Sequence, residues 1–253
     1  MRSGPPARER KRAVSAQARS PHELEALLRD LGPAIRRGMA SADRTRTNAL
    51  LHPTGLLEVD RLLGGGFPQG RLCEVTGSSS CGRTSLAFSL LAGTTRAGHC
   101  VALVDCADAF DPASASDRGV QLERVLWIRP RGLDAALRCS ERLLATDGFP
   151  LVLLDLADRM QTGSPAAREA RDARRWLRLA RRAAGAHSTL IVLSDTRCAG
   201  TSAHVAIVMR PARAHFSRGP ALFEGLEVEV ELTRHRTRPV GRRAALRLGS
   251  HAA

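Results

Sequence analysis

The chain has 253 residues, of which 43% are hydrophobic and 25% charged, and its formal net charge is +14 at pH 7. This composition suits one globular α/β domain with short extensions, and the charge favours a polyanionic partner. No apolar run approaches the roughly 18–20 residues of a membrane span, and the N-terminus lacks the apolar core of a signal peptide. We therefore expect a cytoplasmic protein with no membrane partner. Its six cysteines form no Cys-x-x-Cys pair, which predicts buried thiols rather than disulfides or a metal site.

The first 50 residues differ from the rest. Residues 1–20 carry six basic residues and one acidic residue, with Pro and Ser between them, and predict a disordered basic arm. Residues 21–50 hold an N-terminal helix and a linker, because Leu24, Leu27 and Leu28 recur at the spacing of one helix face. The main domain is expected over residues 51–253.

Strand and helix patterns alternate along the first part of this main domain. An apolar strand at 72–76 precedes a helix at 84–97. Further strands are expected at 100–105, 125–128, 151–156 and 189–194, with helices at about 132–146 and 166–184. Near-continuous apolar strands alternating with helices predict a mostly parallel sheet covered by helices on both faces.

The last 50 residues follow a different pattern. Strand-like segments at 205–210, 226–234 and 244–248 have no helices between them, and the run LEVEVEL alternates strictly between apolar and acidic residues. Such alternation is typical of antiparallel strands with one face in water. We therefore predict an antiparallel C-terminal extension of the sheet.

A phosphate-binding loop is predicted directly after the strand at 72–76. The ATPase motif reads G-x-x-x-x-G-K-[ST], and only its lysine is replaced here, by Arg83. The candidate nucleotide-binding residues are Gly77, Ser78, Ser79, Ser80, Cys81, Gly82, Arg83, Thr84 and Ser85. Thr84 and Asp155, which ends the apolar run LVLLD, are the candidate ligands of the Mg²⁺ ion that would accompany ATP.

Several motifs in a fixed order resemble the RecA recombinase superfamily. They are TGLLEVDRLLGGGFPQGRLCEVTG, GSSSCGRTS, LVDCADAFDPASASDRGV, LVLLD, TLIVLSDTR and LTRHRTRP, spread over residues 54–248. The resemblance implies a RecA-like P-loop NTPase core, with a mostly parallel central sheet and helices on both faces. It also implies a role in DNA repair, with ATP and Mg²⁺ as cofactors and DNA as a partner.

The departures from the family pattern concern its ATPase chemistry. The resemblance places the catalytic glutamate of the family on Ala107, its γ-phosphate sensor glutamine on Asp195, and its phosphate-loop lysine on Arg83. Loss of one such group can slow phosphoryl transfer by factors of roughly 10³–10⁵. We therefore assign no catalytic residue and expect no hydrolysis. The two loops that bind single-stranded DNA in the family are also short here, one after Asp155 and one after Asp195.

This combination resembles ImuA-type RecA paralogues and implies a non-hydrolysing scaffold or accessory factor for translesion synthesis in the SOS damage response. Its partners would be a RecA filament or a translesion polymerase complex, with self-association through the N-terminal helix. Two alternatives stay open. One is an active DNA-dependent ATPase and recombinase that binds single-stranded DNA, and the other is an ATP-binding switch without turnover.

Arginine residues carry two further predictions. Because an unpaired Arg83 would keep a fixed cation beside a helix N-terminus, we predict a salt bridge from Arg83 to Asp155 or Asp195 that plugs the loop. A stripe of arginines also recurs along one helix face: Arg168, Arg171, Arg175, Arg178 and Arg182. It is either a solvated face or a surface for DNA or an acidic partner. The residues expected to pack on the sheet are Ala173, Trp176, Leu177, Ala180 and Ala184.

Overall fold

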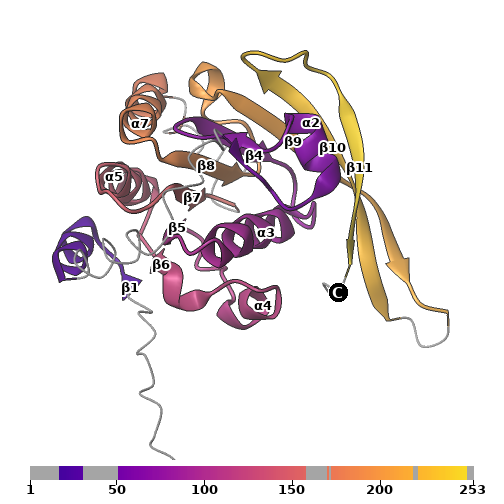
Figure 1. The fold of residues 1–253 in the computed structure, drawn as a ribbon, viewed down its shortest axis with the longest axis horizontal. Helices are drawn as coiled ribbons and strands as arrows, with labels where there is room; N and C mark the ends of the chain where they lie inside the picture. Colours follow the sequence, from indigo (N-terminus) through magenta and orange to yellow (C-terminus); the bar gives the residue numbers. More distant parts are fainter. Residues whose placement is uncertain (1–16, 31–50, 158–169, 171, 219–221, 250–253) are drawn as a thin grey trace, which may run out of the picture.

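A computed structural model describes residues 17–30, 51–157, 170, 172–218 and 222–249. Within these residues one sheet has nine strands in the order β1-β6-β5-β7-β8-β4-β9-β10-β11 (Figure 1). The strands are β1 (Gln17–Ala18), β4 (Leu72–Thr76), β5 (Val101–Asp105), β6 (Val125–Ile128), β7 (Leu151–Asp155), β8 (Thr189–Ser194), β9 (Val205–Phe216), β10 (Phe223–His235) and β11 (Arg243–Gly249). Strands β2 (Leu51–His52) and β3 (Phe67–Pro68) form a separate antiparallel pair.

The strand directions confirm the predicted fold class. In the nine-stranded sheet every pairing from β1 across to β9 is parallel, whereas β10 pairs antiparallel with both β9 and β11. Strand β9 extends to Phe216 rather than ending near residue 210. Beyond Met209 its side chains are mostly exposed, so its distal half lacks the apolar pattern from which a strand is predicted. The β9–β10 hairpin projects beyond the rest of the sheet (Figure 1).

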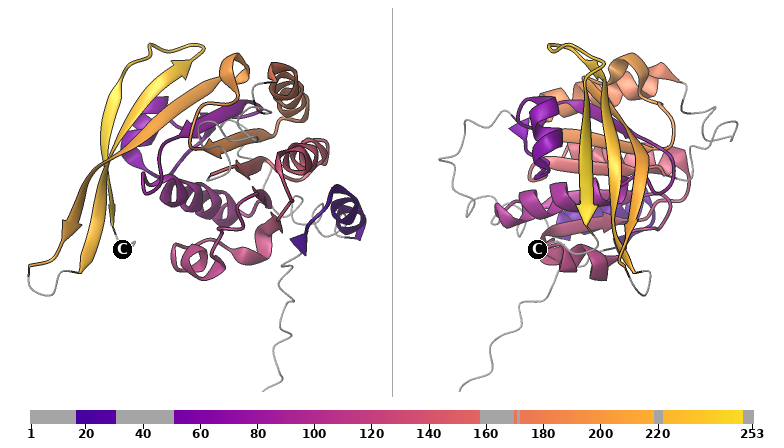
Figure 2. Two further views of the ribbon diagram at one scale, coloured as in Figure 1. Left: turned by 180° about the vertical axis from the view of Figure 1, so that it is seen from behind. Right: turned by 90° about the vertical axis from the view of Figure 1, so that its right-hand side faces the viewer.

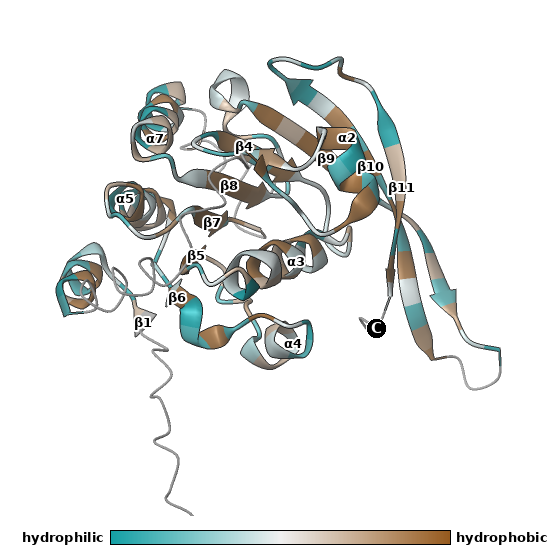
Figure 3. Cartoon of the chain, viewed as in Figure 1, coloured by the Kyte–Doolittle hydropathy of each residue, from teal (hydrophilic) through white to brown (hydrophobic). Residues whose placement is uncertain are grey.

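Helices cover both faces of the sheet (Figure 2). They are α2 (Leu57–Leu63), α3 (Arg83–Arg96), α4 (Pro112–Asp117), α5 (Leu133–Leu144) and α7 (Ala173–Ala186), with 3₁₀ turns at Leu122–Arg124 and Gly200–Ser202. One core cluster joins the α2 and α3 face to the sheet, and a second joins the α5 and α7 face. The central strands between them are the most hydrophobic part of the chain (Figure 3), as expected for parallel strands buried on both faces. No helix among the described residues is long and apolar enough to cross a membrane.

The described residues of the N-terminal segment, 17–30, form a strand and a helix. Strand β1 pairs with β6, and Ala18 is fully buried. The prediction of a disordered arm over residues 1–20 is therefore wrong for its last residues, from Gln17 on. A helix over residues 21–30 follows, as predicted. Two side chains cap its start, because the Ser20 hydroxyl accepts from the Glu23 amide and the Glu23 carboxylate accepts from the Arg19 amide. Leu24 is fully buried in the core beneath α5 and α7.

The cysteines are largely enclosed. Cys73, Cys81, Cys106 and Cys139 are buried, whereas Cys100 and Cys198 are partly exposed. None of the described cysteines forms a disulfide. Burial raises the pKa of the Cys139 thiol to about 11, so this thiol stays protonated and unreactive near neutral pH.

Candidate nucleotide site

The backbone of the phosphate-binding loop is retained. Strand β4 ends at Thr76, the loop follows, and Gly82 in the left-handed conformation (φ 87°) caps the start of α3. A Cβ atom on Gly82 would lie 2.4 Å from Leu248 Cδ1, and one on Gly77 would lie 2.3 Å from the Met209 carbonyl oxygen. Both glycines are therefore required by close packing against β9 and β11. The amide groups at the N-terminus of α3 provide a partial positive charge of the kind that can bind phosphate.

Arg83 and Asp195 form a largely buried ion pair in front of this loop. Arg83 Nη2 lies 2.8 Å from Asp195 Oδ1, and the two side chains are only 9% and 14% exposed. Parallel pairing of β4 with β8 places Thr76 beside Ser194, so Asp195 follows β8 at the same sheet edge as the loop. The predicted salt bridge is confirmed, with Asp195 rather than Asp155 as the partner. Arg83 Nη1 is buried and has no hydrogen-bond acceptor within the described part of the chain.

The two candidate metal ligands have different surroundings. Thr84 is exposed at the start of α3. Asp155 ends β7, and its Oδ1 accepts a hydrogen bond from the Ala157 amide at 2.9 Å. The described residues contain no cluster of three or more acidic, His or Cys side chains suited to a metal ion. Thr84 and Asp155 would thus have to be completed by phosphate oxygens and water, as Mg²⁺ sites in nucleotide-binding proteins commonly are.

The segment around Ala107 offers no replacement for a catalytic carboxylate. Asp105 is 1% exposed and accepts hydrogen bonds from the Ala109 and Phe110 amides and from Trp127 Nε1. Asp108 has a left-handed backbone (φ 57°) and pairs with Arg129 at 3.1 Å. Asp105 therefore holds the loop in shape, and Asp108 is held by an exposed ion pair. Neither carboxylate has the free, oriented oxygen that a general base requires.

The short loop after β8 is held from two sides by charged residues. Glu74, fully buried in β4, accepts hydrogen bonds through Oε1 from the Cys198 and Ala199 amides at 2.6 and 2.9 Å. Arg234 of β10 donates from Nε to the Ala203 carbonyl oxygen at 2.6 Å. Burial and the adjacent Glu74 carboxylate raise the pKa of the Cys198 thiol well above its usual value. The loop is thus closed against the core instead of extending into solvent.

Sequence reasoning missed Glu74 and Arg234 as residues that shape the site. A signal for Glu74 was present, because a lone carboxylate inside a fully buried parallel strand requires hydrogen-bond partners. Arg234 gave no such signal, because arginines are abundant in this chain and its carbonyl acceptors lie in a distant loop. Both residues belong to the support of the loop that carries Asp195.

The arginine stripe on α7 is partly engaged with α5. Arg178 lies 3.0 Å and Arg182 3.9 Å from Glu141, and Arg175 pairs with Asp134. Arg168 and Arg171 lie outside the described residues. The helix begins at Ala173, after an Asp172 cap, rather than at residue 166. Three of the five stripe arginines therefore join two helices through partly exposed ion pairs.

The buried face of α7 differs from the predicted one. Trp176, Leu179 and Ala183 are buried, whereas Ala173 and Leu177 are exposed. The prediction that Trp176 packs inward is correct, and its indole nitrogen donates to the Ala170 carbonyl oxygen at 2.7 Å. Leu177 follows Trp176 by one residue, or about 100° around the helix, and so points away from the sheet. Leu177 was predicted to pack on the sheet because it was placed on the helix face opposite the arginine stripe, and that assignment is wrong.

Comparison with known proteins assigns the chain to a family. The RecA N-terminal domain model matches residues 31–171, more than half of the chain. The chain belongs to the RecA family. It is similar to Protein RecA of Picosynechococcus sp., with 32% identity over 117 residues (46% of this chain and 34% of the relative). It is also similar to the chloroplastic DNA repair protein recA homolog 1 of Arabidopsis thaliana, with 32% identity over 134 residues (52% and 30%).

A solved structure extends the likeness of this RecA-family chain to the whole core. The crystal structure of the RadB recombinase superposes with a TM-score of 0.60 at 25% identity, covering 78% of this chain and 96% of RadB. By contrast, the chain spans only about a third of the length of the curated relatives described above. The RecA-like core is therefore shared with these proteins.

Proposed function

We propose that this RecA-family chain is a non-hydrolysing accessory factor of DNA repair, with the ImuA-like role of a scaffold for translesion synthesis in the damage response. The observation that carries the proposal is the ion pair between Arg83 and Asp195. It neutralises the cation that would meet the terminal phosphates of ATP and places a carboxylate in front of the loop. A carboxylate repels a triphosphate, whereas an amide at the same position would donate a hydrogen bond.

The residues present fit a bound phosphate better than they fit ATP turnover. The loop backbone and the α3 N-terminus can hold phosphate oxygens, and Thr84 and Asp155 could complete a Mg²⁺ site with them. Hydrolysis needs in addition a group that orients the attacking water and a cation on the developing charge. Ala107 cannot supply the first, and Arg83 is committed to Asp195.

The closed loop after β8 supports the same proposal on the DNA side. In the family, single-stranded DNA binds to long loops after the strands corresponding to β7 and β8. Here Glu74 and Arg234 hold the loop after β8 against the core, so it has no free length to follow a DNA strand. We therefore propose DNA repair proteins, a RecA filament or a translesion polymerase complex, as the main partners, with DNA contacted through basic surface residues.

Self-association is the remaining partner proposal. The helix over residues 21–30 lies on its own core, with Leu24 fully buried and Glu25 paired to Arg142 of α5 at 2.6 Å. Association through this helix would therefore require it to leave this position and pack on a neighbouring protomer. Light scattering over a range of protein concentrations tests this proposal, because a helix exchanged between protomers makes the mass rise with concentration.

An ATP-binding switch without turnover is favoured by one specific observation. Arg83 Nη1 is a buried donor without an acceptor in the described part of the chain, and such donors are costly unless a ligand or water satisfies them. A phosphate oxygen in the loop would be a suitable acceptor. This alternative shares the prediction of no hydrolysis but adds measurable nucleotide affinity.

A DNA-stimulated ATPase assay tests the proposal. We expect the wild-type protein to release no phosphate above background with saturating Mg-ATP and single-stranded DNA. Thr84→Ala is the matched control, because Thr84 is exposed and its loss removes a Mg²⁺ ligand without disturbing the core. Turnover in the wild type that disappears in Thr84→Ala would refute the proposal. Binding of a fluorescent ATP analogue without turnover would instead establish the switch.

A further inference from the structure

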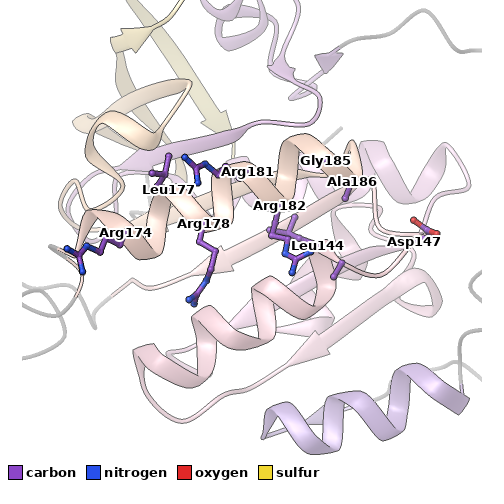
Figure 4. Close-up of a pocket in the computed structure, with 10 residues that line it drawn as sticks. Leu144, Asp147, Arg174, Leu177, Arg178, Arg181, Arg182, Gly185 and Ala186 are labelled. Carbon is purple, nitrogen blue, oxygen red and sulfur yellow. The ribbon is translucent and has the colours of Figure 1, made fainter.

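The solvent face of α7 forms a groove that the nucleotide site does not use. It has a volume of about 830 Å³ and lies over α7 and the end of α5 (Figure 4). Its lining residues are Leu144, Ala145, Asp147, Arg174, Leu177, Arg178, Arg181, Arg182, Gly185 and Ala186. Helices α5 and α7 belong to the core cluster on the opposite face of the sheet from α3. The groove is therefore separate from the phosphate-binding loop.

The groove lining combines apolar and basic side chains. Leu177 is 45% exposed although it is a large hydrophobic residue. Arg174 and Arg181 precede and follow it at helical spacings of three and four residues, so the three side chains form one line along α7. In Figure 4, Arg178 and Arg182 point instead toward α5. An exposed leucine between arginines suits a partner that carries both apolar and negatively charged groups.

Charge distinguishes the groove arginines from the rest of the stripe. Arg178 and Arg182 share the Glu141 carboxylate. Arg174 and Arg181 are exposed and have no ion pair with any residue in the described part of the chain. Helix α7 itself contains no acidic residue, and Asp147 is the one acidic side chain that lines the groove. The groove therefore keeps an excess of positive charge.

Gly185 in the last turn of α7 has no structural reason to be glycine. Its φ is not positive, and a Cβ atom there would contact none of the described residues within 4 Å. Glycine destabilises a helix interior relative to alanine, so the fold alone would be better served by alanine. The missing side chain leaves the end of the groove open, which is what close approach by another backbone requires.

We propose that this groove binds an acidic amphipathic helix of a partner protein. From Arg174 to Ala186 the groove follows about 18 Å of helix axis, at 1.5 Å per residue, which matches about three turns of a docked helix. The leucines of the partner helix would cover Leu177, and its flanking carboxylates would pair with Arg174 and Arg181. A nucleic acid fits less well, because no lining residue is aromatic and several lining residues are apolar.

The occupant is not part of this chain. No segment outside the described residues carries a net negative charge, and the whole chain has a formal charge of +14. A second copy would therefore be repelled from the groove rather than attracted. The proposal does not depend on the nucleotide site, so ATP turnover would leave it unaffected.

The test uses the full chain and a designed probe. The probe is a fluorescein-labelled 14-residue helical peptide with leucines on one face and glutamates on both flanks. A control peptide has the same composition with its leucines distributed around the helix. We expect the ordered peptide to bind at least about tenfold more tightly than the control in fluorescence anisotropy at roughly physiological salt.

Three variants separate the contributions of shape and charge. Gly185→Leu changes no charge and should weaken binding of the ordered peptide about fivefold or more, because the new side chain fills the end of the groove. Arg174→Glu with Arg181→Glu should weaken it at least about tenfold. The matched control is Arg213→Glu with Arg247→Glu, which reverses the same number of exposed charges on β9 and β11 and should change affinity less than about twofold.

Three results would overturn the proposal. Equal binding of the two peptides, or failure of both to bind, would show that the groove does not recognise an amphipathic helix. An equal loss in the Arg213 and Arg247 control would show general electrostatic attraction. Tight binding of a 14-nucleotide single-stranded DNA that needs Arg174 and Arg181, and that the ordered peptide does not displace, would show a nucleic-acid surface instead. Thermal melts of each variant confirm that a loss of binding is not a loss of fold.

Discussion

Replacing Arg83 with alanine should destabilise the fold itself. The Arg83 and Asp195 side chains are 9% and 14% exposed and 2.8 Å apart, so the substitution leaves a nearly buried carboxylate without its cation. Removing one partner of a buried pair costs about 3–5 kcal/mol. The slight exposure of Asp195 admits some water, so we expect about 3 kcal/mol. For a domain of this size that lowers the melting temperature by roughly 6–12 °C.

Two double variants separate this effect from simple loss of packing. Arg83→Met with Asp195→Leu removes both charges together and should keep most of the stability, because apolar side chains of similar volume commonly replace buried ion pairs without loss. Arg83→Lys with Asp195→Gln introduces the lysine and glutamine typical of the family. This second variant should melt at a higher temperature when Mg-ATP is added, because a ligand that binds only the folded state stabilises it.

Thermal melts of the wild type and the variants, each with and without Mg-ATP, measure these effects. In a working ATP site, Arg83→Ala would spare stability and abolish nucleotide affinity. A melting temperature unchanged by Arg83→Ala, together with an ATP-dependent rise in the wild type only, would therefore refute the plugged-site interpretation. An equal loss of stability in Arg83→Ala and in the Met and Leu double variant would show that packing, not the ion pair, sets the cost.

Two further predictions concern buried polar groups. Glu74→Ala should lower the free energy of unfolding by about 2–4 kcal/mol in urea titrations, because it leaves the Cys198 and Ala199 amides without an acceptor. Glu74→Gln, which keeps an acceptor oxygen, should cost less; an equal cost would contradict this. Burial, with repulsion from His99, lowers the pKa of His52 to about 4. The unfolded chain therefore binds the extra proton, and stability should fall as the pH drops from about 6.5 to about 4. His52→Leu should lose less stability over this range, and identical pH profiles for the two proteins would contradict the assignment.

The fold was predictable from sequence because its signals are local. Apolar runs separated by helical periodicity fixed the parallel strands, and the glycine-bounded loop fixed the start of α3. The pairing of Arg83 with Asp195 was predictable to within two candidates, because neighbouring parallel strands end at one sheet edge. The choice between Asp155 and Asp195 required the register that places Thr76 beside Ser194.

The features that were missed depend on tertiary contacts. The inward face of α7 is decided by where Trp176 packs and donates its hydrogen bond, not by the number of apolar residues on each side. The distal half of β9 is mostly exposed and lacks an apolar alternation, and its ladder with β10 makes it a strand. Glu74 acts on amides more than a hundred residues later in the chain, a separation at which sequence periodicity carries no information.

The proposed loss of catalysis and the closure of the loop after β8 would have one structural basis. Asp195 begins this loop, Cys198 and Ala199 follow it, and each part is held by a charged residue of the core: Arg83, then Glu74. Restoring glutamine at residue 195 alone would leave the buried Arg83 guanidinium without its carboxylate. Restoring lysine at residue 83 alone would leave Asp195 facing the phosphates. Nucleotide affinity should therefore return only when both positions change together. Hydrolysis would additionally need a carboxylate in place of Ala107, because the neighbouring Asp105 and Asp108 carboxylates are already engaged.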